Sequence, residues 1–321
     1  MDVAIDPNGN IYIADLFNDV VGRIDGASGN ITTYAGNGVF GFNGDEIPAT
    51  QASLSEPSGL WVTDRGDLYI AESFGHRIRL VPQGGVGITT VAGNGERGYQ
   101  GDGGRATETA LDTPVNVVAD ADGNLYIAER FGNRVRRVAR DGTISTYAGN
   151  GVQGFSGDNV PATETRLNIP MDVALDQAGN LYIADSFNNR IRRVDAQTGI
   201  ITTVVGTGVE GTTGDGGPAT LARIAFPNGL YISEDGTIYF IEGENHHIRR
   251  VDPGEPTVEV PAIPASASDF DGDGQVGFPD FLSFAAVFGT ISTDSGFQTA
   301  FDLDSSGAVD FTDFLIFIEA F

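Results

Sequence analysis

Cysteine and lysine are absent from this 321-residue sequence, and histidine occurs only three times. Without cysteine the chain can form neither a disulfide nor a thiolate metal site, which leaves its compartment open. All 18 basic residues are arginine, against 44 acidic residues, so the formal net charge is −26. A chain this acidic repels phosphate backbones, and we therefore expect no nucleic-acid partner. Long apolar runs are also missing, so we expect no transmembrane segment.

Glycine, in contrast, is abundant and regularly spaced. A loop glycine recurs at Gly36, Gly93, Gly149 and Gly206. A proline recurs with the same steps at Pro57, Pro114, Pro170 and Pro227. Self-similarity with a period of about 57 residues is typical of a repeat architecture. Each copy holds four short alternating apolar runs, which in the fourth copy are 172–175, 181–184, 191–194 and 201–205. These runs predict four antiparallel β-strands per repeat, the blade of a β-propeller.

The motif of each copy resembles the NHL repeat. In the fourth copy it reads Gly-Asn-Leu-Tyr-Ile-Ala-Asp at 179–185, followed by Asn-Asn-Arg-Ile-Arg-Arg-Val at 188–194. The added Gly-rich loop is similar to that of long NHL repeats in bacterial secreted and teneurin-like proteins. The resemblance implies an all-β propeller with five visible four-stranded NHL blades, in a five- or six-bladed ring. The copies cover residues 1–55, 56–112, 113–168, 169–225 and 226–260.

A carboxylate ends the second predicted strand of every copy, at Asp15, Glu72, Glu129, Asp185 and Glu242. Three copies carry an arginine five residues later, at Arg77, Arg134 and Arg190. The spacing predicts an ion pair within one blade, because the planar guanidinium suits a partly buried carboxylate. The alternative is a polar ring that binds a ligand.

First-strand residues line the channel of a propeller, so Asp2, Asn116 and Asp172 predict an acidic mouth there. Calcium-dependent lactonase-like and strictosidine-synthase-like propellers use such positions for catalysis. Gly59 and Gly229 occupy the same position in the other two copies, so the constellation is incomplete.

Two other groups favour structural roles. His76 and His246 fall on a turn position of the repeat, which favours a turn residue over a catalytic base. The Gly-rich loops favour connectors between blades over a phosphate cradle; each contains a Gly-Asp pair, at Asp45, Asp102, Asp158 and Asp215.

The composition changes after residue 260. Residues 261–268 are a Pro/Ala/Ser linker, and residues 269–321 hold two acidic loops, each followed by an apolar helical stretch. Both loops have the spacing of an EF-hand, which predicts two calcium ions. The predicted ligands are Asp269, Asp271, Asp273, Gln275 and Asp280 in the first loop, and Asp302, Asp304, Ser306, Ala308, Asp310 and Asp313 in the second.

The aspartate at the last loop position and the tandem loop–helix units make residues 269–321 resemble a type I dockerin, a small α-helical domain. The resemblance implies a cohesin-like receptor as partner. Phe278-Pro279 and Phe311-Thr312 replace the usual small hydroxyl pair of dockerins, and eleven phenylalanines lie between Phe270 and Phe321. A cell-surface component, or copies of the chain itself in a fibre or lattice, are therefore further candidates.

These features predict a secreted, calcium-binding NHL propeller that serves as a protein-interaction or structural module, attached or polymerised through its dockerin-like tail. The alternative is a propeller enzyme, such as a lactonase, a lyase or a polysaccharide-active protein. Met1–Asp6 matches Met171–Asp176, which lies inside a repeat. We therefore expect a leader and another blade upstream in the natural polypeptide.

Overall fold

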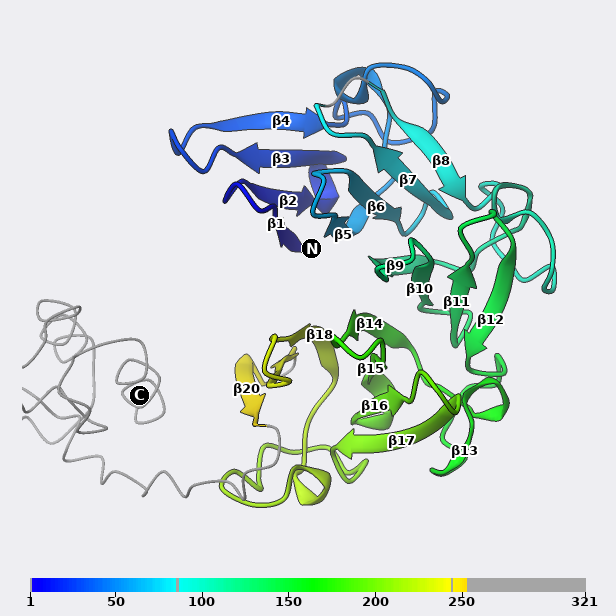
Figure 1. Cartoon of the computed structure of the whole chain (residues 1–321), viewed down its shortest axis with the longest axis vertical. Helices are drawn as coiled ribbons and strands as arrows, with labels where there is room; N and C mark the ends of the chain where they lie inside the picture. Colours follow the sequence, from blue (N-terminus) through cyan, green and yellow to red (C-terminus); the bar gives the residue numbers. More distant parts are fainter. Residues whose placement is uncertain (1, 85–86, 244, 253–321) are drawn as a thin grey trace, which may run out of the picture. The chain divides into compact units, whose positions relative to one another are not determined.

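The computed structural model describes residues 2–84, 87–243 and 245–252 (Figure 1). Within them, five antiparallel β-sheets follow one another along the chain, which confirms the predicted all-β propeller with five visible blades. The helices of this part are short 3-10 turns, and none is long and apolar enough to cross a membrane. The predicted linker at 261–268, the dockerin-like segment at 269–321 and its two calcium loops lie outside the described residues.

Blades 1 to 3 have four strands each. Blade 1 comprises β1 (Val3–Ile5), β2 (Ile11–Asp15), β3 (Val20–Ile24) and β4 (Ile31–Ala35). Blade 2 comprises β5 (Pro57–Val62), β6 (Leu68–Glu72), β7 (Arg77–Val81) and β8 (Thr89–Ala92). Blade 3 comprises β9 (Pro114–Ala119), β10 (Leu125–Glu129), β11 (Arg134–Val138) and β12 (Ile144–Ala148).

The last two blades differ in strand number. Blade 4 comprises β14 (Pro170–Leu175), β15 (Leu181–Asp185), β16 (Arg190–Val194) and β17 (Ile200–Val205), with β13 (Val160–Pro161) paired to the edge of β17. The described strands of blade 5 are β18 (Pro227–Ile232), β19 (Ile238–Glu242) and β20 (His247–Val251). The fourth strand expected for blade 5 falls beyond residue 252.

Short 3-10 turns complete the repeat. Two follow the second strands of blades 1 and 4, η1 (Leu16–Asn18) and η5 (Ser186–Asn188). The others lie in the Gly-rich loops: η2 (Ala49–Gln51), η3 (Ala106–Glu108), η4 (Ala162–Glu164) and η6 (Ala219–Leu221). As expected, each of these loops connects the outer strand of one blade to the inner strand of the next.

Local chemistry explains the first hairpin of each blade. In blade 4 the Asp176 carboxylate accepts the backbone N–H groups of Ala178 at 3.0 Å and Asn180 at 2.9 Å. Gly179 between them has φ of +81°, which glycine adopts without strain. The same carboxylate–asparagine turn recurs at Asp6 and Asp120. The turn thus supports the register of β14 and β15 through contacts within five residues.

The hydrophobic core consists of four clusters, each between two successive blades. Between blades 3 and 4, for example, Ala128 and Val135 of blade 3 pack in one cluster with Val173 and Ile183 of blade 4. Blades 2, 3 and 4 therefore bury apolar side chains on both of their faces, and each depends on its neighbours for stability.

Candidate functional site

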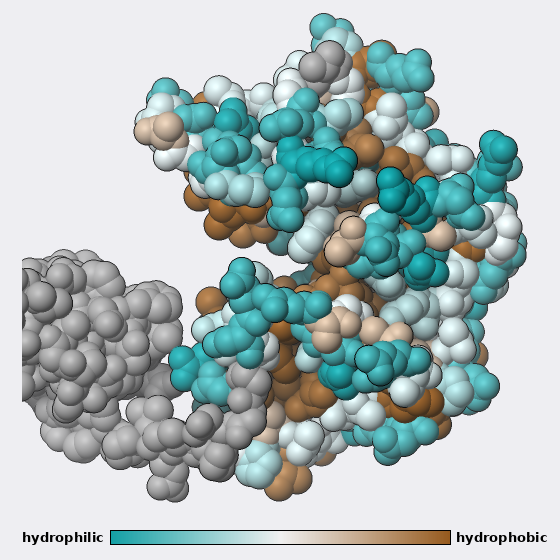
Figure 2. Space-filling model, viewed as in Figure 1, coloured by the Kyte–Doolittle hydropathy of each residue, from teal (hydrophilic) through white to brown (hydrophobic). Residues whose placement is uncertain are grey.

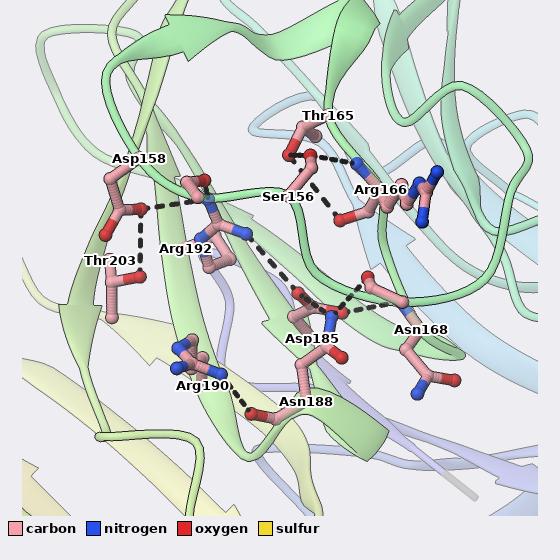
Figure 3. A network of polar contacts seen from close by, with 12 residues as sticks. Ser156, Asp158, Thr165, Arg166, Asn168, Asp185, Asn188, Arg190, Arg192 and Thr203 are labelled. Carbon is pink, nitrogen blue, oxygen red and sulfur yellow. Dashed lines mark hydrogen bonds and ion pairs between the residues drawn. The ribbon is translucent and has the colours of Figure 1, made fainter.

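The largest buried polar groups are arginines in the third strand of blades 2 to 4. Arg192 in β16 is fully buried, and its Nη2 donates to the carbonyl of Gly157 at 2.8 Å and to Asp158 Oδ1 at 2.9 Å (Figure 3). Its Nη1 lies 3.6 Å from Oδ2 of the buried Asp185. Arg192 thus ties the loop that leaves blade 3 to the second strand of blade 4.

The same three-part contact recurs in three other blades. Arg79 joins Asp45 and Glu72, Arg136 joins Asp102 and Glu129, and Arg249 joins Asp215 and Glu242. Each Gly-Asp loop is therefore a connector held by an arginine of the following blade, as the sequence favoured. Burial raises the pKa of Glu72 and Glu129 to about 7, against the lowering effect of Arg79 and Arg136. Burial also raises the pKa of Asp185 to about 6, against hydrogen bonds from Asn188 and Asn168 and the charge of Arg192.

The predicted pairing with Arg77, Arg134 and Arg190 is wrong by two residues. Arg190 lies directly opposite Asp185 in the sheet, but its guanidinium donates to the carbonyls of Asn188 and Thr207 at 3.0 and 2.6 Å. It also stacks 3.9 Å from the ring centre of Phe155. Arg192, two residues further along the same strand, places its Nη1 3.6 Å from Asp185 Oδ2 instead.

The channel residues bind backbone groups of neighbouring blades. Asp2 Oδ2 accepts the N–H of Leu60 at 2.8 Å, and Asp172 Oδ2 accepts the N–H of Leu230 at 2.6 Å. Their other oxygens accept the N–H groups of Val3 and Val173, both at 2.8 Å. Burial raises the pKa of both carboxyls, and the charge of Asp2 raises that of Asp172 further.

Asn116, the third predicted channel residue, has a buried Oδ1 without a hydrogen-bond partner. Gly59 is not a gap in a ligand set, because a Cβ there would lie 2.5 Å from the Val115 carbonyl oxygen. Residues 2–252, as far as they are described, hold no group of three or more His, Asp or Glu side chains that could bind a metal. The channel end is therefore a polar seam between blades.

His76 is a turn residue, as predicted, and it links two blades. It adopts φ of +49°, and its Nδ1 accepts the N–H of Thr113 at 3.2 Å. Asp19, Asn133 and Asn189 accept the equivalent N–H of the next blade in the same way. Burial lowers the pKa of His76, which keeps the imidazole neutral and able to accept.

An exposed aromatic position of the repeat was missed by sequence reasoning. The residue two after the carboxylate of the second strand is phenylalanine in four blades, and its exposure is 86, 57, 41 and 48 % at Phe17, Phe74, Phe131 and Phe187. The repeated phenylalanine is visible in the sequence, but only the exposed fractions show that these side chains lie largely outside the core. We call these four residues the aromatic rim.

The Gly-rich loops carry further exposed aromatic residues beside the aromatic rim. Phe42, Tyr99 and Phe155 are 43, 44 and 37 % exposed, and each stacks on an arginine of the following blade. The guanidinium of Arg97, in the loop after blade 2, lies 5.2 Å from the ring centre of Phe131. Turns and loops therefore meet at one edge of the propeller, where aromatic and arginine side chains gather.

No family model matches this chain. NHL repeat-containing protein 2 of Bos taurus is 28 % identical over 311 residues, covering 86 % of this chain and 42 % of that protein. Teneurin-1 of Mus musculus is 26 % identical over 232 residues, covering 65 % of this chain and 8 % of that protein. The chain thus spans less than half the length of these relatives.

Among solved structures, the nidogen/laminin complex contains a chain that superposes with a TM-score of 0.53 at 16 % identity. The match covers 78 % of this chain and 75 % of that one, and it shows the fold alone. With the five sheets, it leads to one conclusion: the described part of residues 2–252 folds as a β-propeller, and its sequence is similar to that of NHL-repeat proteins.

Proposed function

We propose that this chain is a secreted, calcium-binding protein-interaction module. The propeller presents the aromatic rim to a protein partner, and residues 269–321 attach or polymerise it through two calcium-loaded loops. The exposed phenylalanines carry the proposal. A position that is 41 to 86 % exposed, yet is phenylalanine four times, supports binding at the surface, since aromatic and arginine side chains are enriched at protein interfaces.

The relatives agree with this role. Teneurin-1 and NHL repeat-containing protein 2 are similar in sequence to this chain, and a solved complex of nidogen with laminin contains the same fold. The calcium part rests on the two acidic loops of the sequence, whose ligand spacing suits the modest affinity of extracellular calcium modules. Secretion follows from this need for calcium at about millimolar concentration.

Isothermal titration with calcium tests the loops directly. The full chain is expected to bind two ions, and the double variant Asp271→Ala/Asp304→Ala is expected to lose both. Asp25→Ala, which removes a propeller carboxylate that lies outside both loops, is the matched control. Failure of the wild-type chain to bind calcium would refute the calcium assignment.

Immobilised type I cohesin and the immobilised full chain are the two probes for partners. Calcium-dependent binding to the first identifies a dockerin-like receptor, and binding to the second identifies self-assembly. The variant Phe74→Ser/Phe131→Ser/Phe187→Ser is expected to keep its folding transition and to weaken the contacts that the propeller makes with a bound partner. If neither probe binds in calcium and the triple variant changes nothing, the interaction module is ruled out for these partners.

The enzyme alternative would use Asp2 and Asp172, the two channel carboxyls with raised pKa values. Each of their four oxygens already accepts a backbone N–H, which favours a structural role. A third tightly bound ion that persists in Asp271→Ala/Asp304→Ala would favour the enzyme instead.

A further inference from the structure

A cavity of about 240 Å³ lies between blades 1 and 2. It is found at the turn before β2, whereas Phe17 of the aromatic rim follows the other end of that strand. Its wall includes Asn8, Tyr12, Arg23 and Tyr34 of blade 1, and Gly66 and Gln83 of blade 2. The size suits one substituted six-membered ring, since a cavity of roughly 150 Å³ accepts a benzene molecule.

The blade 1 side of this cavity is held in place by its own contacts. The carboxylate of Asp6 accepts hydrogen bonds from Asn10 Nδ2 at 2.7 Å and from the Tyr12 hydroxyl at 3.3 Å. The rings of Tyr12 and Tyr34 pack edge to face, with their centres 4.9 Å apart. Arg23 Nη2 donates to Asn10 Oδ1 at 2.7 Å. A wall that is ordered before a ligand arrives lowers the entropic cost of binding.

Three side chains of the wall retain hydrogen-bonding capacity. Arg23 donates through Nη2 alone, and its buried Nε has no hydrogen-bond partner among the described residues. The backbone N–H groups of Asn8 and Gln83 are each bonded at 2.9 Å, but their side-chain amides bond no other residue in the described part of the chain. Each amide can both donate and accept. The cavity therefore offers donors and acceptors from both blades.

The charges at the cavity favour a neutral ligand. Burial acts to raise the pKa of Asp6, but hydrogen bonds from Asn10, Asn8 and Tyr12 hold it below its ordinary value, so the carboxylate is ionised. Asp25 Oδ2 lies 3.1 Å from Arg23 Nη2. Two carboxylates beside one guanidinium repel an anion, and the guanidinium in the wall repels a cation. Hydroxyl groups match the remaining groups of the wall, because they donate and accept without charge.

We propose that this cavity binds one neutral sugar ring, either a free monosaccharide or the terminal residue of a glycan. Apolar C–H groups of the sugar pack against the ring of Tyr34, and its hydroxyl groups bond Arg23, Asn8 and Gln83. Figure 2 shows hydrophilic residues over much of blades 1 and 2, so recognition there depends on hydrogen bonds rather than on an apolar patch. The site is separate from the aromatic rim and from residues 269–321.

The repeat itself supplies variants that keep the fold. Blades 2 and 4 carry valine at the position of Tyr34, and blade 4 carries alanine at the positions of Asn8 and Gln83. Tyr34→Val and Asn8→Ala/Gln83→Ala are therefore expected to unfold at temperatures close to that of the wild type. Tyr147→Val is the matched control. It removes the corresponding ring of blade 3, which packs on Tyr126 with ring centres 4.8 Å apart.

Saturation-transfer NMR of the full chain with a panel of neutral monosaccharides identifies a ligand, and isothermal titration then measures its affinity. The wild type is expected to bind one sugar per chain. Tyr34→Val and Asn8→Ala/Gln83→Ala are each expected to weaken binding at least about tenfold, whereas Tyr147→Val leaves it unchanged. Equal affinity for the methyl glycoside assigns the site to the end of a glycan, and its rejection assigns the site to a free monosaccharide.

Three results would overturn the proposal. One is the absence of saturation transfer to every neutral sugar in the panel. Another is binding that survives in Tyr34→Val but is lost in Tyr147→Val, which would place the ligand beside blade 3. The third is tighter binding of a sugar acid or an amino sugar than of any neutral sugar, which would contradict the charge argument. None of these results bears on the calcium or aromatic-rim tests, so the two proposals fail separately.

Discussion

The contact of Arg192 with Asp185 and Asp158 makes a quantitative prediction about stability. Replacing Arg192 with methionine keeps a long apolar stem but leaves the buried Asp185 carboxyl without its counter-ion. Breaking a buried ion pair in this way costs about 3–5 kcal/mol. Arg190→Met is the matched control two residues away. It removes two hydrogen bonds to carbonyls and a stack on Phe155, and is expected to cost about 1–2 kcal/mol.

The loss in Arg192→Met is expected to depend on pH. Burial raises the pKa of Asp185 from its ordinary value of 3.8 to about 6 in the folded chain. Between these two pH values folding takes up a proton, so the contribution of Asp185 to stability decreases as the pH rises from about 4 to about 6. Without Arg192 the pKa of Asp185 rises further, and more of the carboxyl is neutral at pH 5 than at pH 8. The variant should therefore lose less stability at pH 5 than at pH 8.

Urea unfolding, followed by the fluorescence of the single tryptophan Trp61, measures both variants at the two pH values. The free energy of unfolding of Arg192→Met should lie well below that of Arg190→Met at pH 8. An equal or larger loss for Arg190→Met would refute the assignment of the buried ion pair to Arg192, and would restore the pairing that the sequence spacing predicted.

Three further outcomes are expected. Gly149→Ala should destabilise the chain far more than Gly123→Ala. Both glycines have φ of +83°, but a Cβ at Gly149 would lie 2.3 Å from the Asn133 carbonyl oxygen, whereas a Cβ at Gly123 would meet open space. Thermal unfolding of the two variants tests this difference. The pKa values of about 7 at Glu72 and Glu129 predict that the melting temperature falls from pH 5 to pH 8, and that Glu129→Gln flattens this slope; a melting temperature that rises with pH would contradict it. His76→Asn should match the wild type at pH 8 and exceed it at pH 5, because the lowered pKa of His76 makes folding release a proton there; calorimetry at both pH values checks this.

The repeat, the strands and the hairpin turns could be predicted from the sequence because they depend on local chemistry. Alternating apolar residues specify a strand that buries a face, and Asp176 with Gly179 specifies the turn by hydrogen bonds within five residues. The role of His76 as a turn residue followed from its place in the repeat, although its hydrogen bond to Thr113 in the next blade did not.

Tertiary structure decided which arginine meets the buried carboxylate. Sequence spacing gives the residue opposite Asp185, but the loop that brings Asp158 comes from the preceding blade, 34 residues earlier in the chain than Arg192. Only the packed blades place both carboxylates around one guanidinium. The same holds for Asp2 and Asp172, each of which accepts an N–H from a leucine 58 residues later in the chain.

The sequence by itself determined that the chain repeats, how each repeat folds and which residues turn it. It could not show that four copies leave the same phenylalanine partly exposed. The exposed fraction of a side chain depends on the residues packed around it. Two isoleucines at the same repeat position, Ile191 and Ile248, are therefore buried and exposed respectively, because a following blade packs against the first. That difference exists only once the blades are packed.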